Sequence, residues 1–228
     1  MSDMLIKSLE WLDEKVDSKI TEYYHHKFIE EQKDLDKNRF EKFIESFNNR
    51  YSKDSIGSNK VNEFNKQLIR KFATYLSLDN VYMAMSGIKS LSIYTVFNAI
   101  FEESHHEVKL NTNTIFIASP WNGGNLTGNT SAIYVVSEGF YQGKNHKGFY
   151  LEDLDIAFVH NGNHSISIAT IMDDINITTN SVFPSGNLKQ DFFNATITFN
   201  SIEINGESYS VDWKLAVLLY MIQQVYRP

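Results

Sequence analysis

A cluster of small polar residues in the second half of the chain has the types and spacing that suit anion binding. The largely apolar residues 154–159 lead into five polar or small residues, Asn161, Gly162, Asn163, His164 and Ser165. An apolar pattern then resumes, which is typical of a strand that turns sharply into a helix. The N–H groups in the first turn of a helix have no acceptor within it, and they attract phosphate. We therefore expect a phosphate-binding turn here, with His164 as the catalytic residue.

Three residues earlier in the chain are candidates to line the same pocket. Trp121, Asn122 and Asn125 follow a short apolar run that ends at Pro120. An indole ring stacks on a base and amides hydrogen-bond to a sugar, so these side chains are candidates for a pocket wall opposite His164. For Trp121, a place in the core is the first expectation.

Two other interpretations of the polar cluster stay open. A glycine followed by asparagine is a common end for a buried strand, and a histidine at a helix start often only caps the backbone. His160 and His164, completed by Asp155, Glu152 or Asp173, could instead bind a metal. A zinc pair with this spacing needs one continuous helix, and Gly162 interrupts it, so we expect no metal ligands here. Asp173 and Asp174 are either a solvated helix end or ligands of Mg²⁺.

Composition and charge exclude several classes of protein. The net charge is −7, which argues against extensive binding to nucleic acid or to an anionic membrane. Without cysteine the chain has no thiol nucleophile, disulfide or cysteine-ligated zinc. No secretory signal is evident, and the longest apolar run, residues 215–222, is far shorter than the ~20 residues of a membrane helix. We expect a cytoplasmic protein.

The elements that must position these residues divide the chain into two regions. Residues 1–105 are predicted to be helical, with apolar stripes at helical spacing, for example Phe40, Phe43, Ile44 and Phe47, and later Val61, Phe64, Leu68, Phe72 and Leu76. Residues 106–228 show short strands separated by glycine and asparagine. The prediction is an α+β fold, in which an N-terminal helical bundle packs on a small α/β domain that ends in a hairpin and a helix.

Four local signals define the second region. Residues 115–117 are predicted to form a short strand, and residues 175–183 a strand after the Gly162 helix. Asn205-Gly206 is the strongest signal for a two-residue hairpin turn. Asp212 is predicted to cap a last helix over residues 213–225, which is apolar on nearly every side.

The order strand, polar segment, strand, Gly162 turn, helix and strand over residues 113–183 resembles the ParB/sulfiredoxin superfamily. Members carry a Gly-x-His/Arg-Arg turn that holds nucleotide phosphates, and a polar segment that closes over the ligand. The resemblance implies that Gly162 is the turn glycine, Asn163 a backbone donor, and His164 the residue that faces the phosphates. The Pro-Trp-Asn and Gly-Asn-His-Ser segments also resemble a group of small bacterial or phage-borne proteins that has no assigned activity.

The sequence departs from this superfamily at two positions. Ser165 stands where members usually have an arginine that clamps a phosphate, and Asn163 stands at the position of the catalytic cysteine of sulfiredoxin. Sulfinic acid repair by that route is therefore excluded. An arginine from outside the motif, Arg39, Arg50, Arg70 or Arg227, could complete the site.

These observations predict a protein that binds a nucleotide, ATP or another nucleoside triphosphate with or without Mg²⁺. Hydrolysis or phosphoryl transfer is left open. The alternative is a non-catalytic protein-interaction module of a phage-defence or mobile-element system. In that case the apolar last helix would contact a protein partner or a second copy of the chain.

Overall fold

The computed structural model describes residues 27, 30–49, 58–85, 94–118, 139–184 and 187–227, although not the side chains of 58–62, 81–85, 94 and 95. It is a mixed helix and strand structure, which confirms the α+β class. Trp121, Asn122, Asn125 and the arginine at position 50 lie outside the described residues. Among the helices that are described, none has the length and apolar character needed to span a membrane.

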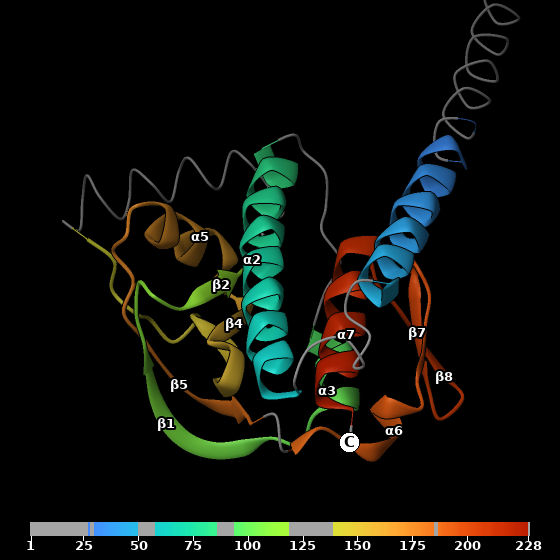
Figure 1. Cartoon of the computed structure of the whole chain (residues 1–228). Helices are drawn as coiled ribbons and strands as arrows, with labels where there is room; N and C mark the ends of the chain where they lie inside the picture. Colours follow the sequence, from blue (N-terminus) through green and yellow to red (C-terminus); the bar gives the residue numbers. More distant parts are fainter. Residues whose placement is uncertain are drawn as a thin grey trace, which may run out of the picture.

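The centre of the fold is a five-stranded mixed sheet in the order β1-β5-β3-β4-β2 (Figure 1). Its strands are β1 (Ser104–Leu110), β2 (Ile115–Ile117), β3 (Lys147–Leu151), β4 (Ile156–Asn161) and β5 (Ile177–Phe183). β3 pairs with β4 in antiparallel register and with β5 in parallel register, while β2 runs parallel to β4. The carboxyl ends of β2 and β4 therefore lie at the same end of the sheet.

The two faces of the sheet carry separate apolar clusters because successive strand residues point to opposite sides. On one face, Phe149, Phe158 and Phe183 pack against Phe97 and Phe101 at the α3 helix (Tyr94–Ile100). On the other face, Ala157 and Val159 belong to a cluster with Ile166 and Ala169 of α5 (Asn163–Ile171). Both faces of β4 are thus covered, which explains its nearly continuous apolar sequence.

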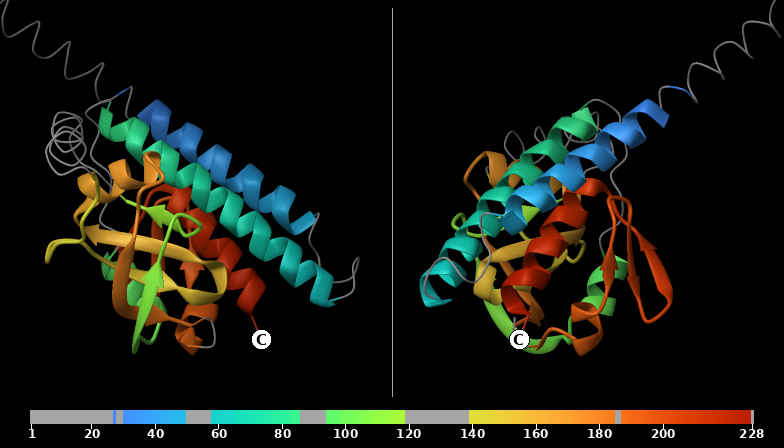
Figure 2. Two further views of the ribbon diagram at one scale, coloured as in Figure 1. Left: turned by 90° about the vertical axis from the view of Figure 1, so that its left-hand side faces the viewer. Right: turned by 45° about the vertical axis from the view of Figure 1, so that its right-hand side comes forward.

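Helix α2 (Ser58–Met85) covers the outer edge of the sheet, beside β2. Ser77 Oγ donates to the Phe116 carbonyl at 2.5 Å, and Asn80 Nδ2 donates to the Ala118 carbonyl at 3.1 Å. These bonds satisfy carbonyls that an edge strand would otherwise leave exposed. A helix over residues 30–49 runs beside α2 in both views of Figure 2, and the Phe43 and Phe72 rings lie 5.5 Å apart.

The part of the chain after β5 forms a small second sheet and an internal helix. After β5 come α6 (Gln190–Phe193), β6 (Thr196–Ile197), β7 (Ser201–Ile204) and β8 (Glu207–Ser210). The predicted hairpin turn is confirmed, with positive φ at Asn205 and Gly206. Helix α7 (Trp213–Tyr226) follows, and its residues 215–219 are at most 2% exposed. α7 is therefore part of the core and does not offer an exposed apolar face to a partner.

The structure differs from the sequence-based predictions in three further features. Residues 104–110 form β1, where the sequence pattern placed the end of the helical region, so His105 and His106 lie on a strand. On α2 the buried apolar positions include Ile69 and Ala73, while Phe64 of the predicted stripe is 52% exposed. The main core cluster combines apolar residues of the helices, from Phe40 to Phe101, with residues of the sheet and α7, so one core crosses the predicted boundary at residue 105.

Candidate functional site

The predicted turn lies where the buried strand β4 ends and α5 begins. Gly162 is the residue before the helix and has a left-handed backbone, with φ 79° and ψ 20°. A Cβ at this position would lie 2.4 Å from His146 Cδ2 and 3.0 Å from the Asn145 carbonyl oxygen. Both the backbone conformation and the close neighbours therefore require glycine here.

The polar residues around Gly162 organise the start of the helix. The Gly162 N–H donates to Asn161 Oδ1 at 2.9 Å, which holds the turn. The first bond within α5 runs from the Ile166 N–H to the Gly162 carbonyl at 3.0 Å. The N–H groups of the three residues before Ile166 lie in the first turn, at the positive end of the helix dipole.

The structure places the predicted site residues at different depths. Asn161 is exposed, and Gly162 and Ser165 are half-buried. Asn163 and His164 are only 6% and 7% exposed. The imidazole of His164 therefore lies inside the molecule at the start of α5, so it could reach a ligand only from the buried side of the turn.

A polar cavity of about 350 Å³ adjoins the turn. It is lined by residues in or next to β1, β3, β4 and β5, namely Glu103, His105, residues 146–148, His160 and residues 178–181. Lys147 is the register partner of Asn161 across the β3 and β4 pair. The cavity and the Gly162 turn are therefore two parts of one region of the surface.

His146 joins these two parts, and the sequence pattern did not single it out. Its ring lies against Gly162 and 5.0 Å from the Phe140 ring centroid. The Gly143 N–H donates to His146 Nδ1 at 2.7 Å, so a neutral His146 ring carries its proton on Nε2. The half-buried His146 is therefore a hydrogen-bond donor at its other nitrogen when neutral.

Burial affects the protonation of two histidines that line the cavity. Desolvation lowers the pKa of His146, and desolvation together with the charge of Lys147 lowers the pKa of His160. Both imidazoles are therefore neutral at pH 7, since their ordinary pKa is already about 6.5. Lys147 carries the permanent positive charge of the lining residues, and Glu103 carries the negative charge.

The segment before the cavity is fixed to the sheet by a side-chain amide. Gln142 Nε2 donates to the Thr178 carbonyl at 2.8 Å, and Gln142 Oε1 accepts from the Thr178 N–H at 2.7 Å. The Phe140 N–H donates to Asp174 Oδ2 at 2.9 Å. These contacts place His146 beside Gly162, and they give Asp174 a structural partner.

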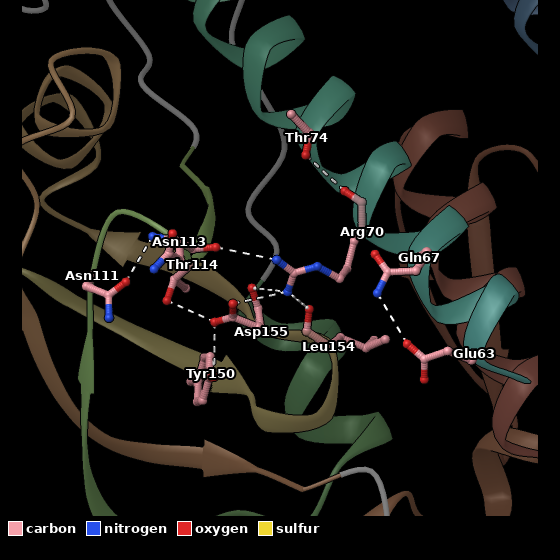
Figure 3. Close-up of polar contacts among 10 residues, drawn as sticks. All are labelled: Glu63, Gln67, Arg70, Thr74, Asn111, Asn113, Thr114, Tyr150, Leu154 and Asp155. Atoms are coloured by element: carbon pink, nitrogen blue, oxygen red, sulfur yellow. Dashed lines mark hydrogen bonds and ion pairs between the residues drawn. The ribbon is translucent and has the colours of Figure 1, made fainter.

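The arginines that the structure describes have partners away from the turn. Arg70 Nη1 lies 3.1 Å from Asp155 Oδ2 and donates to the Leu154 carbonyl at 2.6 Å (Figure 3). Asp155 precedes β4, whereas Gly162 follows it, so this network lies at the opposite end of the strand. Arg39 pairs with Asp36, and Arg227 donates to the Phe193 carbonyl. None of these three arginines replaces the phosphate-clamping arginine of the superfamily, in whose position this chain has Ser165.

The Asp155 network anchors α2 to the sheet. Thr114 Oγ1 and the Tyr150 hydroxyl donate to Asp155 Oδ1 at 2.9 and 3.1 Å, as Figure 3 shows. Burial first, and then the negative charge of Asp155, raise the pKa of the Tyr150 hydroxyl. Tyr150 therefore stays protonated and acts as a donor, and the network is structural. Within the described residues, no group of three histidine or acidic side chains is arranged to hold a metal ion.

Comparisons with known proteins identify a family without a known activity. One family model, described as a family of unknown function (DUF6710), matches residues 23–213. No curated protein and no solved structure matched the chain.

Proposed function

We propose that this chain, which belongs to the DUF6710 family by the match over residues 23–213, binds a nucleotide through its phosphates where β4 turns into α5. One observation carries the proposal. Gly162 has a left-handed backbone at the start of a nine-residue helix, and it lies beside a polar cavity of about 350 Å³. A helix start attracts phosphate through its N–H groups and its dipole.

Each neighbouring residue has a role in this proposal. The N–H groups of Asn163, His164 and Ser165 face the phosphates, and the Ser165 hydroxyl donates a further hydrogen bond. His164 orients or protonates a phosphoryl oxygen from the buried side of the turn. Lys147, opposite Asn161 in the sheet, supplies the positive charge. Mg²⁺ would accompany a triphosphate as part of the ligand.

The resemblance to the ParB/sulfiredoxin superfamily supports the same proposal. β2, β4, the glycine turn, α5 and β5 follow one another as that resemblance expects, but β3 is an additional strand between β2 and β4. The described arginines have partners elsewhere, so we propose binding without rapid turnover, because phosphoryl transfer relies on cations that stabilise the developing charge.

Calorimetry with nucleoside triphosphates and diphosphates, with and without Mg²⁺, tests the proposal. We expect micromolar binding to the wild type, and an affinity about tenfold lower in both His164→Ala and Ser165→Ala, the loss of one charge-assisted hydrogen bond. Ser165 is half-buried, so its variant tests the role if His164→Ala does not fold. His106→Ala is the control, because His106 lies exposed on β1. Titrations without heat on the folded wild type would contradict nucleotide binding.

The alternative, a protein-interaction module of a phage-defence or mobile-element system, loses one of the observations that motivated it, the apolar last helix, and keeps the net charge of −7 and the missing arginine. The apolar residues of α7 are internal, so their hydrophobicity is explained by the core.

A further inference from the structure

The polar cavity has a chemistry of its own, distinct from that of the Gly162 turn. All of its lining residues within the described part of the chain are polar, charged or glycine, and none is aliphatic, phenylalanine, tyrosine or tryptophan. Flat heterocyclic bases bind between apolar or aromatic side chains, whereas sugars and phosphates bind to hydrogen-bonding groups. The cavity therefore suits the sugar and phosphate of a ligand better than a base, for which it offers only the rings of its three histidines.

The cavity wall carries one positive and one negative side chain, and they belong to different parts of the sheet. Lys147 begins β3 beside the Gly162 turn, whereas Glu103 precedes β1. Ser181 Oγ donates to Glu103 Oε1, and His105 Nδ1 lies 3.7 Å from the same oxygen. An anion without hydroxyl groups would be attracted by Lys147 but repelled by Glu103. Sugar hydroxyls would donate to the Glu103 carboxylate. A phosphorylated sugar therefore matches both Lys147, through its phosphate, and Glu103, through its hydroxyls.

The neutral groups of the wall fit the same ligand. His146 Nδ1 accepts from the Gly143 N–H, so that its other ring nitrogen is a donor, and residues 178–181 add hydroxyl and amide groups. The volume of about 350 Å³ lies at the lower end of the range for small-molecule pockets, roughly 300–1,000 Å³. It is large enough for a pentose phosphate.

We infer that the cavity between β1, β3, β4 and β5 is a pocket for a phosphorylated sugar, such as the ribose phosphate part of a nucleotide. The phosphate lies at the Lys147 end beside the Gly162 turn. The sugar hydroxyls face Glu103, His105 and Ser181, and the base lies outside the cavity. The inference rests on the proposed nucleotide site, because the phosphate is shared between the turn and Lys147.

Two adjacent histidines provide a matched pair for the test. His105 lines the cavity, whereas His106 does not, because neighbours on a strand point to opposite sides. Ribose 5-phosphate, adenosine and inorganic phosphate are titrated into the isotope-labelled wild-type protein, and histidine side-chain NMR signals are followed. We expect ribose 5-phosphate to shift the signals of His105, His146 and His160 but not that of His106, and adenosine to shift none of the four.

Substitutions of the lining residues test whether the histidine signals report on the affinity for ribose 5-phosphate. Lys147→Gln should weaken the binding of ribose 5-phosphate about tenfold to a hundredfold, as expected for the loss of a charged hydrogen bond. Ser181→Ala and His105→Gln should weaken it less, and Lys71→Gln on the exposed surface of α2 and His106→Gln should leave it unchanged. Inorganic phosphate should bind more weakly than ribose 5-phosphate.

The outcomes separate the inference from the proposed function. If nucleotides bind, and ribose 5-phosphate neither competes with them nor shifts the cavity histidines, the sugar pocket is overturned while nucleotide binding stands. If ribose 5-phosphate binds with the expected pattern and no nucleotide does, the pocket stands and the proposed function fails. If neither class of ligand binds to the folded protein, both are overturned.

Discussion

Gly162 and Gly206 show how the surroundings of a residue change what its conformation requires. Both have a left-handed backbone, with φ values of 79° and 82°. A Cβ at Gly206 would meet nothing within 4 Å, because the hairpin tip projects into solvent. A Cβ at Gly162 would meet the His146 ring and the Asn145 carbonyl. Alanine is therefore strained by the backbone alone at Gly206, and by the backbone and its neighbours at Gly162.

Alanine substitutions at the two glycines should separate these effects. Gly206→Ala should lower the free energy of unfolding by about 1–2 kcal/mol, the cost of a left-handed non-glycine residue. Gly162→Ala should lower it further, because the His146 ring must move and the Asn145 backbone cannot move freely. Denaturant unfolding of both variants measures the difference. Equal losses would show that the contact between Gly162 and His146 carries no constraint.

The start of α7 combines a cap with a buried charge. Asp212 Oδ1 accepts the Leu215 N–H at 2.8 Å, as predicted from the sequence. Burial raises the pKa of the Asp212 carboxyl, although the Leu215 N–H and the charge of Lys214 act in the opposite direction. Lys214 in turn pairs with Asp79 of α2. The helix start is therefore fixed by hydrogen bonds, at the cost of removing a carboxylate from water.

Asp212→Asn and Asp212→Ala should have different effects on stability. Asparagine keeps the capping oxygen without the charge, so the free energy of unfolding at pH 7 should be equal to or above that of the wild type. Alanine loses the cap and should cost about 1 kcal/mol.

The pH dependence gives a second check on the same position. Because the folded pKa of Asp212 is raised, the folded state binds this proton more readily than the unfolded state. As the pH falls through the folded pKa toward the ordinary value of 3.8, the wild type should therefore gain stability relative to Asp212→Asn. Denaturant unfolding of both proteins between neutral and acidic pH measures this gain, and a difference independent of pH would contradict it.

The main core of the molecule is built from both the helical and the strand-rich region. The cluster contains Phe40 and Ile69 from the first region together with Phe158 and Leu215 from the second. Arg70 of α2 also donates to backbone carbonyls next to β4. The strand-rich region therefore depends on the helices for the burial of one sheet face and of α7.

A fragment of residues 106–228 should consequently fail to fold by itself. The cut falls within β1, and it removes Phe97, Phe101 and the whole of α2 from contact with the sheet and α7. We expect no cooperative thermal transition in the fragment, and strong binding of a hydrophobic dye, whereas the full chain should unfold cooperatively. A fragment with native-like, cooperative unfolding would show that residues 106–228 are an independent domain.

Local patterns predicted the elements that depend on a few neighbouring residues. The left-handed turn at Gly162, the Asn205-Gly206 hairpin and the Asp212 cap each depend on backbone preferences that are encoded within a few positions. The strand over residues 115–117 and the last helix also follow from composition and length. These elements form for local physical reasons, so they can be predicted from the sequence without knowing which distant residues pack against them.

The remaining features depend on residues that are distant in the sequence. β1 has the polar sequence Ser104–Leu110 and becomes a strand because β5 pairs with it. The buried face of α2 is set by the sheet edge and α7 on either side of it, so that Ile69 is buried and Phe64 is not. The cavity collects His105, His146 and His160 from three different strands or their ends. Strand pairing and burial bring such residues together over long separations, and no spacing within the sequence records them.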